Sequence, residues 1–100
     1  MRLIMSVIIG FCFLPVSFAK NSDHNYELLS NLQELARLGA PIVVGLSRKS
    51  MIYKLLDISA EEALNGTSVA NTIALMKGAS ILRVHDVREA MQAVKIVSML

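Results

Sequence analysis

Two short apolar runs, each followed at once by cationic side chains, do most to constrain the fold of this chain. Residues 41–46 are apolar on both faces, as in a strand of a parallel sheet covered by helices, and they lead into Ser47-Arg48-Lys49-Ser50. Residues 81–87 combine β-forming residues with Arg83 and His85, which point the same way because side chains alternate along a strand. Helical patterns separate the runs. Strands that alternate with helices predict βαβ units, hence an α/β fold with a parallel sheet.

Polar groups at the carboxyl ends of parallel strands usually build the functional site of such folds. Lys49 and Ser50 stand where the first strand opens a helix, whose backbone N–H groups favour an anion. Arg83 and His85 end the second strand, and residues 47–48 flank the first. The residues predict an anion site. The alternative is that residues 47–50 form a basic turn in solvent and that Arg83 and His85 end a strand with their side chains facing water.

Helical segments cover the remaining chain. The pattern over residues 22–38 predicts a helix that ends at Gly39. Its one apolar face is formed by Leu28, Leu29, Leu32, Leu35 and Ala36. Ser59 and Glu62 match a capping box for a short helix that we expect to stop near residues 65–66.

Two further helices complete the predicted order. We expect Thr67 to cap a second helix, closed by Gly78. Asp86 should cap a last helix, with Glu89 completing its capping box. The expected apolar stripe of that helix comprises Val87, Ala90, Met91, Val94 and Val97.

Charge and cysteine content exclude several classes of function. A net charge of +2 is too small to indicate a nucleic-acid partner. The single cysteine, Cys12, allows neither an intrachain disulfide nor a cysteine-based metal site, and the two histidines lie far apart in sequence. We therefore expect no metal cluster.

The first 19 residues resemble a secretory signal. A positive start precedes a nearly unbroken apolar run over residues 3–16, and Ser17-Phe18-Ala19 offers a small-x-small cleavage site after Ala19. The run is short for a transmembrane helix. Export through residues 1–19 is therefore one reading of this segment.

Two motifs resemble the last part of bacterial dihydropteroate synthase: G-L-S-R-K-S-M-I at residues 45–52 and I-L-R-V-H-D-V at residues 81–87. Residues 19–21 and 24–29 also look like the segment that precedes them in that family. The likeness runs from about residue 18 to residue 100. It predicts a domain at 18–100, preceded by an apolar segment at 1–17 that lies outside the family pattern.

The resemblance implies a fold and a reaction. The family is a TIM-type (β/α)8 barrel, of which this chain would be a C-terminal fragment of about two βα units, with residues 41–46 as the seventh strand and 80–84 as the eighth. The family is a transferase of folate biosynthesis in the cytoplasm. It joins p-aminobenzoate to a hydroxymethyl-dihydropterin diphosphate and releases pyrophosphate.

The resemblance also assigns residues. Lys49 matches a lysine that contacts the pterin, and Ser50 matches a serine near the carboxylate of p-aminobenzoate. Arg83 and His85 match the pair lining the pterin and diphosphate pocket. Fixed cations there would stabilise the departing diphosphate. Ser47 and Arg48 are weaker candidates for substrate binding.

Departures from the family pattern limit what the isolated chain can do. The family's Asp-containing turn before residues 19–21 is replaced here by Phe13-Leu14-Pro15-Val16-Ser17-Phe18, and the region that brings the family's Mg²⁺ ligand is absent. We expect residues 1–17 to replace upstream family sequence, as after a frameshift or truncation. Without its carboxylates the site should bind pterin poorly, because polar ring edges go unpaired.

These departures leave the activity of the chain open. We expect little or no synthase activity from the chain alone, and self-association through open barrel edges. The alternatives to a transferase fragment are a non-catalytic relic, a piece that complements another barrel fragment, and a small exported binding protein.

Overall fold

A parallel pair of strands, β3 (Val43–Val44) and β4 (Ile81–Leu82), organises the computed structural model of the chain, which describes residues 6–9, 12–15, 22–39 and 41–100. Val43 pairs with Ile81 and Val44 with Leu82. The Arg83 N–H continues the ladder, donating to the Val44 carbonyl at 2.9 Å. The predicted parallel neighbours are confirmed, although the regular strands are shorter than the apolar runs.

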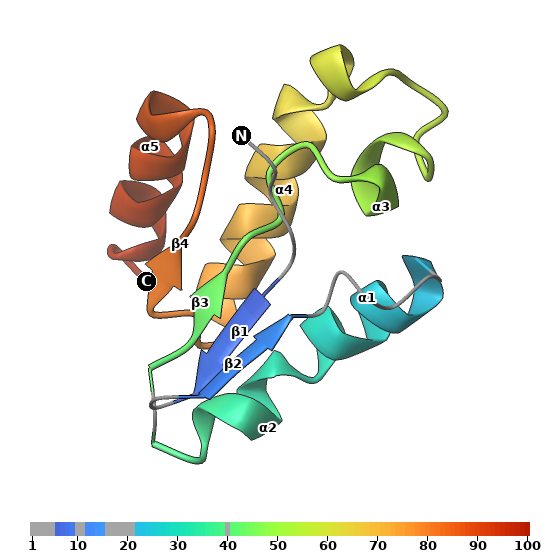
Figure 1. The fold of residues 1–100 in the computed structure, drawn as a ribbon. Helices are drawn as coiled ribbons and strands as arrows, with labels where there is room; N and C mark the ends of the chain where they lie inside the picture. The colour runs from blue at the N-terminus through green and yellow to red at the C-terminus, as the bar shows by residue number, and fades with distance from the viewer. Residues whose placement is uncertain (1–5, 10–11, 16–21, 40) are drawn as a thin grey trace.

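The connection between β3 and β4 is helical (Figure 1). It contains α3 (Ser50–Tyr53), the 3₁₀-helix η1 (Ala60–Glu62) and the long helix α4 (Leu64–Met76), and α5 (Val87–Val97) follows β4 and packs on α4. This order is a βαβ unit followed by a further helix. The α/β prediction is confirmed.

An antiparallel hairpin stands at the start of the chain. Its strands are β1 (Ser6–Ile9) and β2 (Cys12–Pro15), and β1 lies against β3 (Figure 1). The proposed cleavage site at residues 17–19 lies outside the described residues. Within the described ranges, no helix is long and apolar enough to span a bilayer.

The core gathers between the sheet and the helices. Ile42, Val44 and Leu46 are fully buried, as expected for a strand covered by helices. Leu29 of α1 (Ser22–Ser30) and Leu32 of α2 (Leu32–Ala36) meet them there. The predicted helical face is thus confirmed, and the helix is interrupted only at Asn31, whose Nδ2 donates to the Glu27 carbonyl at 2.9 Å.

The predicted helix boundary at residues 65–67 is wrong. The helix α4 begins at Leu64 and runs through Gly66 and Thr67 without a break. A Cβ on Gly66 would stand 2.6 Å from Ile52 Cγ2, so this glycine lets α4 approach α3 closely rather than ending a helix. At Ser59, both the N–H and the hydroxyl donate to Glu62 Oε1, in agreement with the predicted capping pair.

The predicted apolar stripe of α5 is only partly covered. Ala90 and Ala93 are buried, whereas Met91 is 66% exposed and Val94 47% exposed. The small alanine side chains permit close packing against α4, whereas the larger Met91 and Val94 keep much of their surface exposed. Within the part of the chain that the structure describes, much of the predicted apolar face of α5 is therefore exposed.

Tyr26 ties α1 to α3, because its hydroxyl donates to the Met51 carbonyl at 2.8 Å. We expect Tyr26→Phe to lower the free energy of unfolding by about 1 kcal/mol, the usual net contribution of a partly buried hydrogen bond. Urea denaturation of Tyr53→Phe is the control, since the Tyr53 hydroxyl bonds to no other described residue. Equal losses in the two variants would contradict this role.

Candidate functional site

Lys49 is the most unusual residue beyond the carboxyl end of β3. It precedes α3 as its N-cap, and its Nζ is buried without a hydrogen-bond partner among the described residues. Burial, together with a smaller effect of the charge of Arg83, lowers the pKa of the Lys49 ammonium from 10.5 to about 8. Buried charges in proteins are normally paired, so this ammonium is a candidate to receive an anion.

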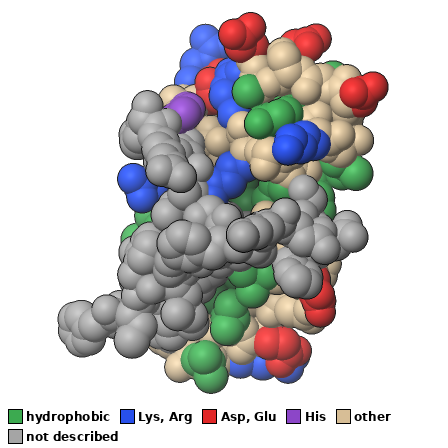
Figure 2. Space-filling model, turned by 45° about the vertical axis from the view of Figure 1, so that its right-hand side comes forward, with side chains coloured by type: hydrophobic (Ala, Val, Ile, Leu, Met, Phe, Trp, Pro, Cys, Tyr) green, Lys and Arg blue, Asp and Glu red, His purple; other side chains and the backbone are tan. Residues whose placement is uncertain are grey.

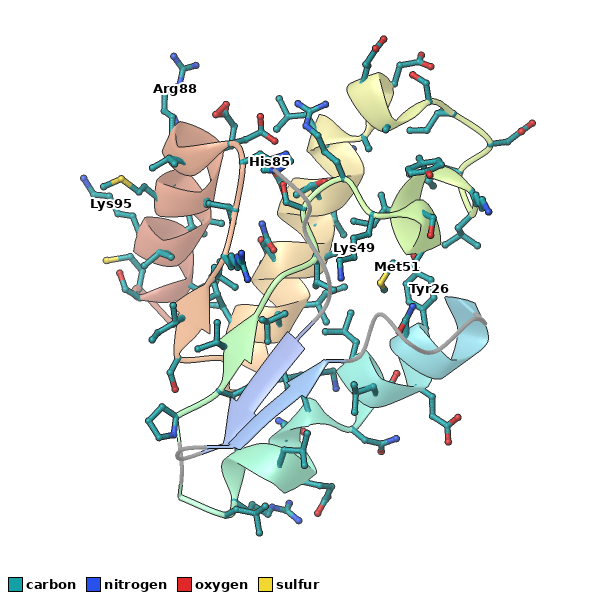
Figure 3. The ribbon with its side chains drawn as sticks, in the orientation of Figure 1. Tyr26, Lys49, Met51, His85, Arg88 and Lys95 are labelled. Carbon is teal, nitrogen blue, oxygen red and sulfur yellow. The ribbon has the colours of Figure 1, made fainter. Side chains whose placement is uncertain are left out.

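Arg83 and His85 follow the end of β4, where both side chains are exposed. The charge of Arg83 reaches Lys49, so the two strand ends do bring their cations together as predicted. In Figure 3, Lys49 and His85 both lie beyond the carboxyl ends of the two strands. Ser50, the first residue of α3, is exposed beside Lys49.

Ser47 joins the two strand ends. Its side chain is buried, and its Oγ accepts a hydrogen bond from the His85 N–H at 3.2 Å. A buried hydroxyl with that partner fixes the backbone beside His85. The weak prediction that Ser47 binds substrate is not tested by this contact.

Arg48 forms a network of its own. Its Nε and Nη2 donate to the two carboxylate oxygens of Asp86 at 3.0 and 3.1 Å, a bidentate ion pair. Its Nη1 donates to the carbonyls of Ala60 at 3.0 Å and Glu61 at 2.8 Å. The Asp86 carboxylate raises the pKa of Arg48, and Arg48 in turn lowers the pKa of Asp86.

The prediction that Asp86 caps α5 through its side chain is wrong. Asp86 does occupy the N-cap position, yet its carboxylate makes no capping hydrogen bond. Both oxygens are engaged by Arg48 instead, because a charge-assisted bidentate pair is stronger than a single bond to a backbone N–H. The ion pair between Arg48 and Asp86 was not predicted from the sequence. Its only sign there is the acidic residue directly after His85.

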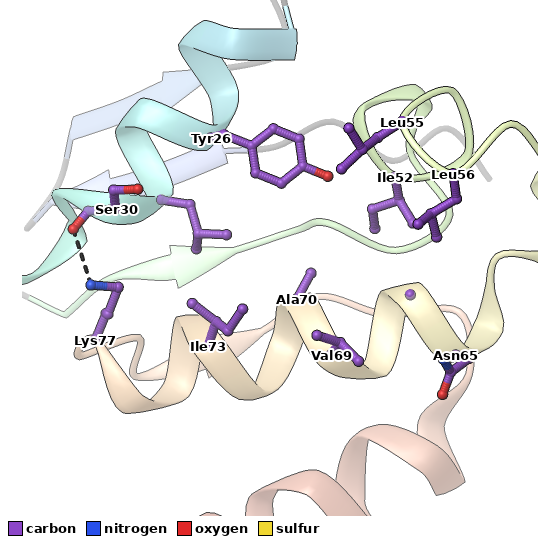
Figure 4. Close-up of a pocket in the computed structure, with 12 residues that line it drawn as sticks. Tyr26, Ser30, Ile52, Leu55, Leu56, Asn65, Val69, Ala70, Ile73 and Lys77 are labelled. Atoms are coloured by element: carbon purple, nitrogen blue, oxygen red, sulfur yellow. Dashed lines mark hydrogen bonds between the residues drawn. The ribbon is translucent and has the colours of Figure 1, made fainter.

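A separate apolar groove of about 330 Å³ lies between α1, α3 and α4 (Figure 4). The Tyr26 ring borders it, and Lys77 at one end donates from Nζ to the Ser30 carbonyl at 3.2 Å. None of the predicted site residues lines it. The groove is therefore distinct from the cationic site.

The described residues do not fit a Mg²⁺ site. Among them, no group of three or more His, Cys, Asp or Glu side chains lies close enough to hold a metal ion. Asp86, the acid next to His85, has both oxygens bound to Arg48. On the face shown in Figure 2, acidic and cationic side chains are interspersed. We assign no step to a metal.

Fold and site together define a class. A βαβ unit with cations beyond the carboxyl ends of neighbouring parallel strands is the arrangement of α/β proteins that bind anionic ligands at that edge. A sequence model of the family described as pterin binding enzyme matches residues 5–85. The chain belongs to this family.

Relatives agree with that assignment. The dihydropteroate synthase of Escherichia coli K12 is 48% identical over 80 residues, which are 80% of this chain and 28% of the relative. The crystal structure of the Vibrio fischeri enzyme superimposes with a TM-score of 0.78 at 46% identity, covering 82% of this chain and 30% of that one. The resemblance stated from the sequence is confirmed.

A Thermus thermophilus dihydropteroate synthase solved with 4-aminobenzoate gives a TM-score of 0.78 at 40% identity, over 85% of this chain and 34% of that one. These neighbours are TIM barrels, so the described residues form an α/β part of such a barrel. The chain spans about 30% of the length of the relatives it matches.

Proposed function

We propose that this chain is a dihydropteroate synthase-like transferase fragment of folate biosynthesis that supplies the diphosphate-binding side of the site. The observation that carries the proposal is the buried Lys49 ammonium, which lacks a partner among the described residues and lies within reach of the charge of Arg83. An anion placed between them would satisfy both cations. It would also raise the pKa of Lys49 toward its usual value.

In the proposed reaction, the amine of p-aminobenzoate attacks the methylene carbon of hydroxymethyl-dihydropterin diphosphate, and the carbon–oxygen bond to the diphosphate breaks. Negative charge grows on the leaving diphosphate. Lys49 and Arg83 are fixed cations that favour its departure, and the flat Arg83 guanidinium can lie against the pterin ring.

The remaining assignments belong to the same proposal. We assign Ser50 to the carboxylate of p-aminobenzoate and His85 to the diphosphate pocket. The proposal places the chain in the cytoplasm, with export through residues 1–19 as the alternative. It keeps residues 1–17 apart from the domain at 18–100, although the family match begins at residue 5.

A second candidate is a non-catalytic relic or a piece that complements another barrel fragment. It is supported by the single parallel strand pair, β3 with β4, among the described residues. Self-association through an open barrel edge, which among the described residues is the edge of β4, belongs to this proposal. Ile81 of β4 is 54% exposed there.

Inorganic pyrophosphate is the probe that tests the anion site, since it is the released product of the proposed reaction. Calorimetry on the full chain should give a dissociation constant in the millimolar range, weakened about tenfold by Lys49→Ala or Arg83→Ala. Arg88→Ala removes an equal charge from exposed α5 and should leave the affinity unchanged.

The outcomes separate the candidates. Binding that both site variants weaken supports the transferase fragment, and absent synthase turnover beside such binding supports the complementing piece. Heat of binding that all three variants reduce alike would show only non-specific attraction and overturn the proposal.

A further inference from the structure

Arg48 adopts a backbone conformation that few non-glycine residues tolerate. Its φ is +52°, in the left-handed region, which costs about 1 kcal/mol for a residue with a Cβ. The Arg48 N–H donates to the Thr67 Oγ1 at 3.0 Å, and the Thr67 side chain is buried in α4. This hydrogen bond fixes the turn between β3 and α3 against the long helix behind it.

The guanidinium of Arg48 is almost fully committed within the protein. A guanidinium has five N–H donors, and four hydrogen bonds to Asp86, Ala60 and Glu61 use all but one. A group so occupied has little capacity left to bind a substrate anion. Its partners belong to the start of α5 and to η1, two elements that contribute nothing else to the predicted site.

These contacts set where the neighbouring cations stand. Arg48 lies directly before Lys49, and Asp86 lies directly after His85. The ion pair between them therefore holds the two cation-bearing segments at one separation, and the Ser47 to His85 hydrogen bond reinforces it. The planar fork of arginine matches both carboxylate oxygens, which a lysine cannot do.

We propose that Arg48 is a positioning residue, which clamps the turn after β3 to Asp86 and η1 and thereby holds Lys49 and His85 in place for the anion. The proposal rests on the proposed function in one respect, since the anion is the diphosphate group of that reaction. It replaces a direct substrate contact for Arg48 with an indirect role.

The test follows the titration of Lys49 in the full chain by NMR, with lysine labelled with ¹³C at the ε position and the Lys49 signal assigned by its loss in Lys49→Ala. In Arg48→Lys and in Asp86→Asn, the released turn exposes the ammonium. We expect the pKa of Lys49 to rise from about 8 by about one pH unit or more toward 10.5 in both variants.

A matched control separates positioning from general destabilisation. Ala74→Gly weakens α4 in the core, away from the clamp, and should lower stability without changing the titration of Lys49. Pyrophosphate affinity is measured on the same proteins, and should fall about tenfold in Arg48→Lys although its charge is kept.

The two readouts distinguish the hypotheses. A Lys49 titration that is the same in wild type, Arg48→Lys and Asp86→Asn overturns the positioning role, whatever happens to pyrophosphate. A shifted titration in a protein that binds no pyrophosphate supports the clamp and counts against the proposed function instead. Equal shifts in Ala74→Gly and the clamp variants would also overturn the proposal.

Discussion

Gly78→Ala is expected to lower the free energy of unfolding by about 3 kcal/mol, a large share of the stability of a small domain. Gly78 joins α4 to β4 with φ +107°, a conformation that side chains rarely adopt. A Cβ there would also stand 2.6 Å from the Ala36 Cβ, which is attached to the backbone and cannot rotate away. The chain would have to shift α2 or the turn into β4.

Gly39→Ala is the matched control, because Gly39 has φ +81° yet open space around the position of a Cβ. It should cost only about 1 kcal/mol, the conformational part of the effect. Ala36→Gly in the Gly78→Ala background should restore part of the loss, since it removes the clashing atom. Urea denaturation measures all three, and equal losses for the two glycine variants would refute the steric argument.

Lys49→Met is expected to stabilise the protein at neutral pH while removing anion binding. The pKa of Lys49 is about 8 in the folded protein and 10.5 without that environment, so the unfolded chain binds more protons between these values. The free energy of unfolding of the wild type should therefore rise with pH across that window, because the burial penalty on the charge disappears. Below pH 8 the penalty is fully present.

The size of the change in the free energy of unfolding follows from the shift in the pKa of Lys49. It is reduced because solvent screens this half-buried side chain. We expect a rise of about 1–2 kcal/mol between pH 8 and 10.5 in the wild type relative to Lys49→Met, which keeps a similar apolar volume. Lys54→Met, at an exposed lysine five residues along, should follow the wild-type curve. If the free energy of unfolding changed with pH in the same way in wild type and in Lys49→Met, the burial of this charge would be contradicted.

The parallel strands and their cationic ends could be predicted because the pattern is local. Residues 41–46 are apolar throughout, and only a covered strand suits them, so the burial of Ile42, Val44 and Leu46 follows. Parallel pairing then brings Lys49 and Arg83 together. The part of the site that depends on strand ends was therefore accessible from sequence.

The errors share a physical cause, which is a partner far along the chain. Gly66 looked like a helix end, but its lack of a side chain serves a contact with Ile52. Asp86 looked like a cap, but Arg48 offers it a stronger pair. Rules that consider only residues close together in the sequence cannot take account of a partner far along the chain. The burial of the Lys49 ammonium likewise depends on packing that no motif encodes.

One spacing recurs through the contacts between the two halves of the βαβ unit. The links from Ile42 to Ser80, from Ser47 to His85 and from Arg48 to Asp86 each join residues 38 positions apart. Closing a chain loop of that size has an entropic cost that grows as about (3/2)RT ln n, and the first link to form bears it. Each later link then forms within a loop already closed. The sheet and the clamp should accordingly form as one cooperative step of folding, late and together, after α4 has shortened the path between them.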